Sequence, residues 1–283
     1  MNWPIRKKKI SKTNSSEGVG EFYDETTDKF LAVYGEIIQA FRTKNVYEYL
    51  DYTIRSIGLK SGMNVIDAGC GVCGPACYFA EKIADLHIDA CSVSKVQIEK
   101  SIQKIKERNL NNNVYPKVAD YHYLAENYES EKYDVVYFLE SFGHSKNKYK
   151  VIDEVWSVLK PGGKLYIKDL FKRESFDEWE QLKIDNICNQ INDAYQYEIG
   201  DIHEVFSYLR KKNFILKFIK IPDVDLDAFE NLTISNDFQN LFNIGKINSW
   251  DQYIFPIDFY EILVQKPSFD LRENKHLFFM NQK

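Results

Sequence analysis

The stretch 64–80, NVIDAGCGVCGPACYFA, places a strand signal, a glycine-rich turn and a helix signal in direct succession. Apolar, mostly β-branched residues surround Asp67, and the chain then turns through Gly69 and Gly71 toward a helix predicted to start at Pro75. Glycine at such a turn lets the backbone approach a ligand where any Cβ would clash. Proline suits the first helical position because no N–H needs a partner there. The stretch predicts an α/β sheet with a nucleotide pocket at the carboxyl end of its first strand.

The spacing of Gly69, Gly71 and Gly74 satisfies the G-x-G-x-x-G pattern, which is a weak signal by itself. Asp67 stands two residues before the first glycine and gives D-A-G-C-G, which resembles motif I of class I S-adenosylmethionine-dependent methyltransferases. The resemblance implies that Asp67 accepts a hydrogen bond from the ammonium group of this cofactor. It also implies that the backbone of Gly69, Cys70 and Gly71 lies against the amino-acid portion. The alternative is a strand–turn–helix unit without a ligand.

Strand and helix signals alternate after this turn, as a doubly wound parallel sheet requires. Strands are predicted at 87–93, 114–119, 133–139, 164–170, 214–221 and 260–265, and helices at 96–108, 150–159, 175–195 and 203–211. The V-L-K-P-G-G-K-L turn at 158–165 also resembles the methyltransferase family, whose last two strands form an antiparallel hairpin. We therefore predict an α/β fold: a seven-stranded Rossmann-like methyltransferase sheet with a helical N-terminal cap and a lid insertion between strands six and seven.

Two aromatic-rich regions lie outside the predicted sheet, and they define the domain boundaries. We expect a flexible N-terminus (1–20), a helical cap (21–57), a methyltransferase core (58–266) with a lid insertion (222–257), and a C-terminal tail (267–283). The switch-point rule places the cap and the lid over the carboxyl ends of the strands. Most of their rings are equally suited to ordinary core packing. The candidate substrate contacts are Tyr23, Tyr34, Phe41 and Trp250.

The end of the second strand lacks the acidic residue that commonly holds ribose hydroxyls in nucleotide-binding sheets. Ser92, Ser94 and Gln97 stand there instead, a variation that resembles sterol and cyclopropane-lipid methyltransferases. A serine hydroxyl both donates to and accepts from a ribose, although Ser94 also suits a helix N-cap. Asp120 and Tyr121 follow the third strand, where the family resemblance implies contacts with the adenine amine and ring. A turn-forming aspartate with a surface tyrosine is the alternative.

The fourth strand runs into Leu139-Glu140-Ser141-Phe142-Gly143-His144, which resembles the equivalent segment of sterol and isoprenoid C-methyltransferases. Burial of Glu140 after an apolar strand is costly unless the carboxylate is paired or neutralised. The resemblance implies alkene methylation through a carbocation, with Glu140 as base or counter-charge and His144 assisting. Three alternatives stay open: Glu140 bonds only a cofactor hydroxyl or a backbone amide, the enzyme methylates oxygen or nitrogen of a small metabolite, or the chain is a non-catalytic binding module.

The composition limits the partners and the compartment. The 37 basic and 42 acidic residues leave a net charge of −5, which argues against a nucleic-acid backbone as partner. No apolar stretch is long enough for a membrane span and no signal peptide is evident, so we expect a cytoplasmic protein with a small-molecule substrate. A homodimer is compatible with the sequence. Cys70, Cys73 and Cys77 have the C-x2-C-x3-C spacing of a metal site, but no adjacent histidine supplies a fourth ligand, and we predict packing and no metal.

Overall fold

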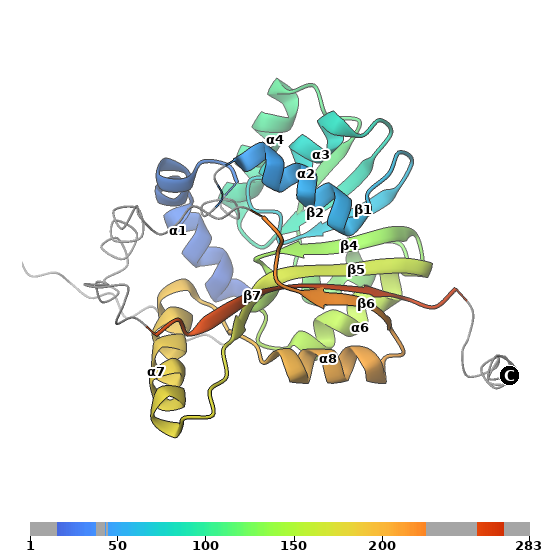
Figure 1. Cartoon of the computed structure of the whole chain (residues 1–283). Helices are drawn as coiled ribbons and strands as arrows, with labels where there is room; N and C mark the ends of the chain where they lie inside the picture. The colour runs from blue at the N-terminus through green and yellow to red at the C-terminus, as the bar shows by residue number, and fades with distance from the viewer. Residues whose placement is uncertain (1–15, 38–42, 44, 225–253, 269–283) are drawn as a thin grey trace, which may run out of the picture.

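A seven-stranded sheet forms the centre of the molecule in the computed structural model, which describes residues 16–37, 43, 45–224 and 254–268 (Figure 1). The strand order is β3-β2-β1-β4-β5-β7-β6. The first five strands are parallel, and β7 is antiparallel to both β5 and β6. This confirms the predicted sheet. The strands are β1 (Asn64–Ala68), β2 (His87–Ser92), β3 (Val114–Val118), β4 (Tyr133–Leu139), β5 (Leu159–Lys172), β6 (Ile215–Lys220) and β7 (Ile257–Gln265).

Helices cover both faces of the sheet, so the central strands are apolar on both sides. On β4, Val135 and Tyr137 pack with the helices α2 (Val46–Ile57), α3 (Gly74–Lys82) and α4 (Lys95–Glu107). Val136 and Phe138 pack with α6 (Lys148–Val158) and α8 (Ile202–Lys211). Figure 1 shows these two helical layers on opposite sides of the strands. The other helices of the described residues are α1 (Ser16–Tyr34), α5 (Leu124–Asn127) and α7 (Glu178–Tyr195).

Several elements begin at other residues than the sequence predicts. Strand β5 begins at Leu159 instead of 164, because Leu159 pairs with Tyr133 across an irregularity in the β4–β5 register. Helix α7 begins at Glu178 instead of 175, because the side chain of Asp177 accepts from the backbone N–H of Glu180 and caps the helix there. Helix α1 already begins at Ser16, within the N-terminal part expected to be flexible, and β7 begins at the last residue of the expected lid.

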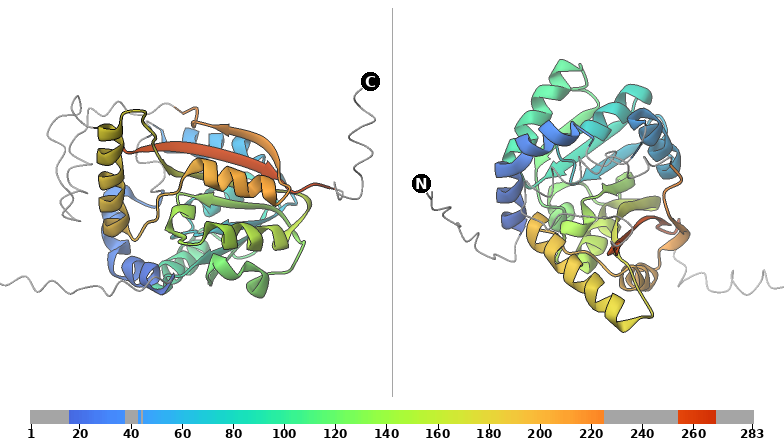
Figure 2. Two further views of the ribbon diagram at one scale, coloured as in Figure 1. Left: turned by 90° about the horizontal axis from the view of Figure 1, so that it is seen from below. Right: turned by 60° about the vertical axis from the view of Figure 1, so that its left-hand side comes forward.

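Helix α1 lies across the carboxyl edge of the sheet, because it bonds to the segments that follow three strands. Asp24 accepts from the Ser94 hydroxyl (2.6 Å) after β2, and Ser16 Oγ lies 3.3 Å from His122 Nδ1 after β3. The third contact joins the Tyr23 hydroxyl to Nε2 of His144 (2.9 Å), a residue that follows β4. Figure 2 shows α1 and α7 at the same end of the molecule. The described part of the expected cap thus covers the edge where the predicted pocket lies.

Candidate active site

The turn after β1 is tight enough to require glycine. Gly69 has φ +84°, and a Cβ at this position would overlap the side chain of Ser141. The backbone N–H groups of Gly69 and Cys70 both donate to the carbonyl of Cys91 at 2.9 Å. Gly71 also has a positive φ, and among the described residues no atom beyond its chain neighbours lies within 4 Å of the place where its Cβ would stand. The turn therefore leaves bare backbone at the carboxyl edge of the sheet, as the glycine pattern predicts.

Asp67 is a buried carboxylate on β1, directly before the glycine turn. It is 3% exposed, and burial raises its pKa to about 7, although the neighbouring Tyr137 hydroxyl acts in the opposite direction. No lysine or arginine within the described residues forms an ion pair with it. An ionised carboxylate is costly to bury without a cation. The site therefore fits the ammonium group of S-adenosylmethionine, which is the role predicted for Asp67.

The three polar residues after β2 form one hydrogen-bonded group. The Ser92 hydroxyl donates to Gln97 Oε1 (2.8 Å) and accepts from the backbone N–H of Ser94 (3.1 Å). Ser94 caps α4 by accepting from the N–H of Gln97, and its own hydroxyl donates to Asp24 of α1. The structure thus brings the three predicted residues together, and Ser94 has the helix-capping role. Their contact with a ribose stays a prediction.

The two residues after β3 have partners within the chain. Asp120 accepts from the backbone N–H of His122 (2.8 Å) and lies 2.6 Å from its ring Nδ1. Burial by itself would raise the pKa of Asp120, but hydrogen bonds from His122 and Ser16 outweigh it and lower the pKa. Tyr121 donates to the carbonyl of Ser141 (3.0 Å) beside the glycine turn. Asp120 therefore caps the short helical turn Tyr121–Tyr123, whereas Tyr121 is half-buried and not the surface residue of the alternative interpretation; the contacts of both with adenine stay a prediction.

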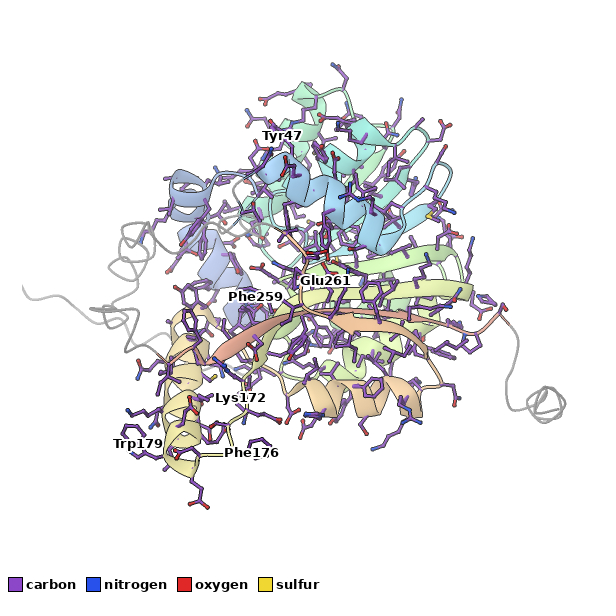
Figure 3. The ribbon with its side chains drawn as sticks, viewed as in Figure 1. Tyr47, Lys172, Phe176, Trp179, Phe259 and Glu261 are labelled. Atoms are coloured by element: carbon purple, nitrogen blue, oxygen red, sulfur yellow. The ribbon has the colours of Figure 1, made fainter. Side chains whose placement is uncertain are left out.

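Glu140 follows β4 with φ +56° and forms an ion pair with Lys168 of β5. The side chains are only 13% and 7% exposed, and the ammonium lies 5.4 Å from the ring centre of Tyr49 and 5.0 Å from that of Phe259. Phe259 projects from β7 near the middle of the molecule (Figure 3). Burial alone would lower the pKa of Lys168, but Glu140 and Tyr49 outweigh it and raise the pKa.

Lys168 is absent from the residues predicted from the sequence. The signal was a lysine inside the expected strand 164–170, directly after the apolar run 165–167. A cation in that position needs a buried anion, and parallel pairing of β4 with β5 places Leu139 beside Lys168. The pairing changes the interpretation of Glu140, because its carboxylate already has an ammonium as its partner.

His144 is buried and neutral, with both ring nitrogens occupied. Its Nδ1 lies 3.0 Å from the carbonyl of Gln196, and its Nε2 lies 2.9 Å from the Tyr23 hydroxyl. Because a carbonyl only accepts, Nδ1 carries the proton and Nε2 accepts from Tyr23. Burial lowers the pKa of His144 to about 4, with a smaller effect from nearby Lys148 in the same direction. The pair joins a predicted substrate residue on α1 to a predicted catalytic residue after β4.

Asp169, next to Lys168, is also absent from the residues predicted from the sequence, and it is a buried acid. It is 1% exposed and accepts from the backbone N–H groups of Gly143 (3.0 Å) and Leu170 (2.7 Å) and from the Tyr197 hydroxyl (2.5 Å). Burial raises its pKa to about 6, against the effect of these three hydrogen bonds. The carboxylate thus connects β5 to the segments that precede His144 and follow α7.

Of the remaining substrate candidates, one lies beside the aromatic rings of α1 and two fall outside the described residues. Tyr34 ends α1, and its ring centre lies 6.3 Å from that of Phe30. Phe41 and Trp250 fall outside the described residues. Aromatic side chains also project at the start of α7, where Phe176 and Trp179 are exposed at the periphery (Figure 3). Over the described part of the chain, we find no helix that combines the length and the apolar character needed to cross a membrane.

The chain is similar in sequence to several curated methyltransferases. The chain is 26% identical to methyltransferase GfsG of Streptomyces halstedii over 190 residues, which span 61% of this chain and 65% of that protein. It is 25% identical to the sterol 24-C-methyltransferase ERG6 of Saccharomyces cerevisiae (71% and 52%) and 26% identical to the chloroplastic tocopherol O-methyltransferase of Arabidopsis thaliana (61% and 56%). The matched region thus spans less than two thirds of each relative.

Solved structures share the fold. The cyclase SpnF superposes with a TM-score of 0.68 at 18% identity, over 89% of this chain and 96% of that one. The geranyl diphosphate C-methyltransferase of Streptomyces coelicolor gives 0.58 at 14% identity, over 78% and 79%. A family model described as a methyltransferase domain matches residues 59–216, more than half of the chain. The chain therefore belongs to the methyltransferase-domain family, whose methyl donor is S-adenosylmethionine.

Proposed function

We propose that this protein transfers the methyl group of S-adenosylmethionine to a carbon atom of a small, largely apolar alkene, such as an isoprenoid or a sterol. The observation that supports this most is the pairing of Glu140 with Lys168 beside the Tyr23–His144 pair, at the carboxyl end of β4. Bound S-adenosylmethionine supplies an electrophilic methyl carbon there. The sterol C-methyltransferases among the relatives support the same class of acceptor.

The residues proposed to hold the cofactor lie along the carboxyl edge. Asp67 faces the ammonium group, and the bare backbone of the turn at Gly69 and Gly71 faces the amino-acid portion. Ser92 and Gln97 are proposed to bond the ribose. Asp120 and Tyr121 are proposed to contact the adenine. Each of these assignments follows from the family resemblance at that position.

The weak basicity of His144 favours an alkene over an alcohol as acceptor. General-base catalysis is efficient when the pKa of the base suits the proton that it removes, and a base with a pKa of about 4 is poorly suited to a hydroxyl. A carbon atom beside a carbocation loses its proton far more readily. We propose that the Tyr23 oxygen takes this proton as its own passes to His144 Nε2, which leaves an imidazolium with Nδ1–H on Gln196.

The charge and the rings at the site bear on the same step. A developing carbocation is stabilised by aromatic faces and by exclusion of water. Tyr23 and Phe30 of α1 lie together with ring centres 5.7 Å apart, and Tyr49 and Phe259 flank the Lys168 ammonium. Glu140 is the counter-charge proposed for such a cation, and its negative charge is already partly balanced by the Lys168 ammonium.

Transfer to oxygen or nitrogen of a small metabolite is the second candidate, favoured by the tocopherol O-methyltransferase among the relatives. The experiment is incubation with methyl-labelled S-adenosylmethionine and, separately, prenyl diphosphates, sterols, phenols and amines, followed by product mass and by NMR location of the label. Label on carbon supports the proposal. Label on oxygen or nitrogen refutes it in favour of the second candidate. Cofactor binding without transfer to any of them favours the non-catalytic alternative.

A variant pair tests the role of Glu140. Glu140→Gln is expected to lose turnover and to keep the affinity for S-adenosylhomocysteine, because the side chain lies beside the methyl site and not in the turn. Glu154→Gln is the matched control: Glu154 forms an ion pair with Lys150 on α6, remote from the turn, and should leave both quantities unchanged. Nearly full activity of Glu140→Gln would remove its catalytic role.

A further inference from the structure

Asp169 bonds to the chain on both sides of His144. One of its oxygens accepts from the N–H of Gly143, the residue directly before His144. The other accepts from the hydroxyl of Tyr197, whose ring centre lies 4.3 Å from the His144 ring at an interplanar angle of 69°. A single buried carboxylate therefore determines where the backbone and the neighbouring ring of His144 lie.

The segment after α7 completes this arrangement. Gln196 has φ +52°, and its carbonyl accepts the hydrogen bond from Nδ1–H of His144. The next two residues contact Gly143. The N–H of Glu198 donates to the Gly143 carbonyl (2.7 Å), and the Tyr197 ring lies so close that a Cβ on Gly143 would overlap it. Because Gln196 directly precedes Tyr197, a displacement of the Tyr197 backbone would also displace the carbonyl that fixes the tautomer of His144.

We propose that Asp169 is a positioning residue for His144. Through Gly143 and Tyr197 it holds the imidazole with Nδ1–H on the carbonyl of Gln196 and with the Nε2 lone pair directed to Tyr23. This inference rests on the proposed function only insofar as His144 takes part in methyl transfer. Asp169 acts through other residues and needs no contact with the acceptor.

A carboxylate suits this position for a chemical reason. Three donors converge on it, and the four lone-pair sites of a carboxylate accept all of them. The amide of asparagine has one acceptor oxygen and an NH2 group that only donates. In Asp169→Asn the NH2 group therefore faces the backbone N–H of either Gly143 or Leu170, and that segment must move.

The test is NMR of the five histidines in 15N-histidine-labelled protein, with His144→Gln to assign the signal of His144. In the native protein we expect a single Nδ1–H tautomer that stays neutral at pH 6. In Asp169→Asn and in Tyr197→Phe we expect a mixture of tautomers and a pKa that rises toward the ordinary value of about 6.5. The affinity for S-adenosylhomocysteine should stay within about twofold, because neither residue lies in the cofactor turn.

A second tyrosine–aspartate pair provides the matched controls. Tyr208 of α8 donates to both oxygens of Asp153 of α6 at 3.0 Å, so Tyr208→Phe and Asp153→Asn remove the same interaction away from His144. Both should leave the His144 signal unchanged. The inference is overturned if His144 keeps its tautomer and its pKa in the folded Tyr197→Phe variant, which removes one oxygen atom and retains the ring. Because no acceptor is present in these spectra, the result is independent of which acceptor the enzyme uses.

Discussion

Replacement of Asp67 by asparagine should stabilise the protein without its cofactor and abolish cofactor binding. The difference between a pKa of about 7 in the folded chain and about 3.9 in the unfolded chain corresponds to roughly 4 kcal/mol. The unfolded chain releases the proton first as the pH rises. The free energy of unfolding therefore falls by this amount between about pH 4 and pH 7, and the asparagine variant avoids the fall.

The assay is urea unfolding at pH 4.5 and pH 8, with and without S-adenosylhomocysteine. At pH 8 and without ligand, Asp67→Asn should be more stable than the native protein by up to roughly 4 kcal/mol, and at pH 4.5 by much less. Ligand at about 100 times its Kd should stabilise the native protein by about 2.7 kcal/mol and leave the variant unaffected. Ligand affinity should also rise with pH through about 7, as Asp67 ionises.

A second carboxylate supplies the control for Asp67. Asp134 forms an ion pair with Lys160 and accepts from the N–H of Asn64, at the opposite ends of β1 and β4. Its replacement by asparagine should destabilise the protein or leave it unchanged, because a favourable partner is lost. The reasoning is refuted if Asp67→Asn is less stable than the native protein at pH 8 without ligand, or if it binds S-adenosylhomocysteine with native affinity.

Two further perturbations act on the buried groups after β4. Lys168→Met leaves Glu140 buried without its partner and should lower the free energy of unfolding in urea by about 3–5 kcal/mol, and the double variant with Glu140→Gln should recover most of that loss. The control is Lys132→Met, which should cost less than about 1 kcal/mol because the pair of Lys132 with Glu129 is exposed. An equal cost at both lysines would contradict the burial argument. The lowered pKa of His144, about 4, means that the unfolded chain takes up a proton between about pH 6.5 and pH 4 that the native chain refuses. The free energy of unfolding should therefore fall by roughly 3 kcal/mol as the pH is lowered from 6.5 to 4, and His144→Gln should remove this part of the pH dependence. Parallel plots of unfolding free energy against pH for the native protein and the variant would refute this role of His144.

The cofactor edge of the sheet was largely predictable from the sequence because its signals are local. Glycine positions, strand runs and helix caps depend on neighbouring residues, so the turn at Gly69 and the bounds of β4 follow directly from the sequence. The bounds of β5 were predicted less well, since its first residues become strand through pairing with Tyr133, far along the chain.

The chemistry after β4 depended on contacts between distant segments. By itself the sequence determined that Glu140 and His144 stand at the end of a buried strand, because strand periodicity and the motif that follows are local properties. Only the tertiary structure decided their state: Lys168 neutralises Glu140, and Tyr23 and Gln196 occupy both nitrogens of His144. The physical reason is that the charge and protonation of a buried group are set by the groups that replace its water, and here these groups come from segments up to 121 residues away.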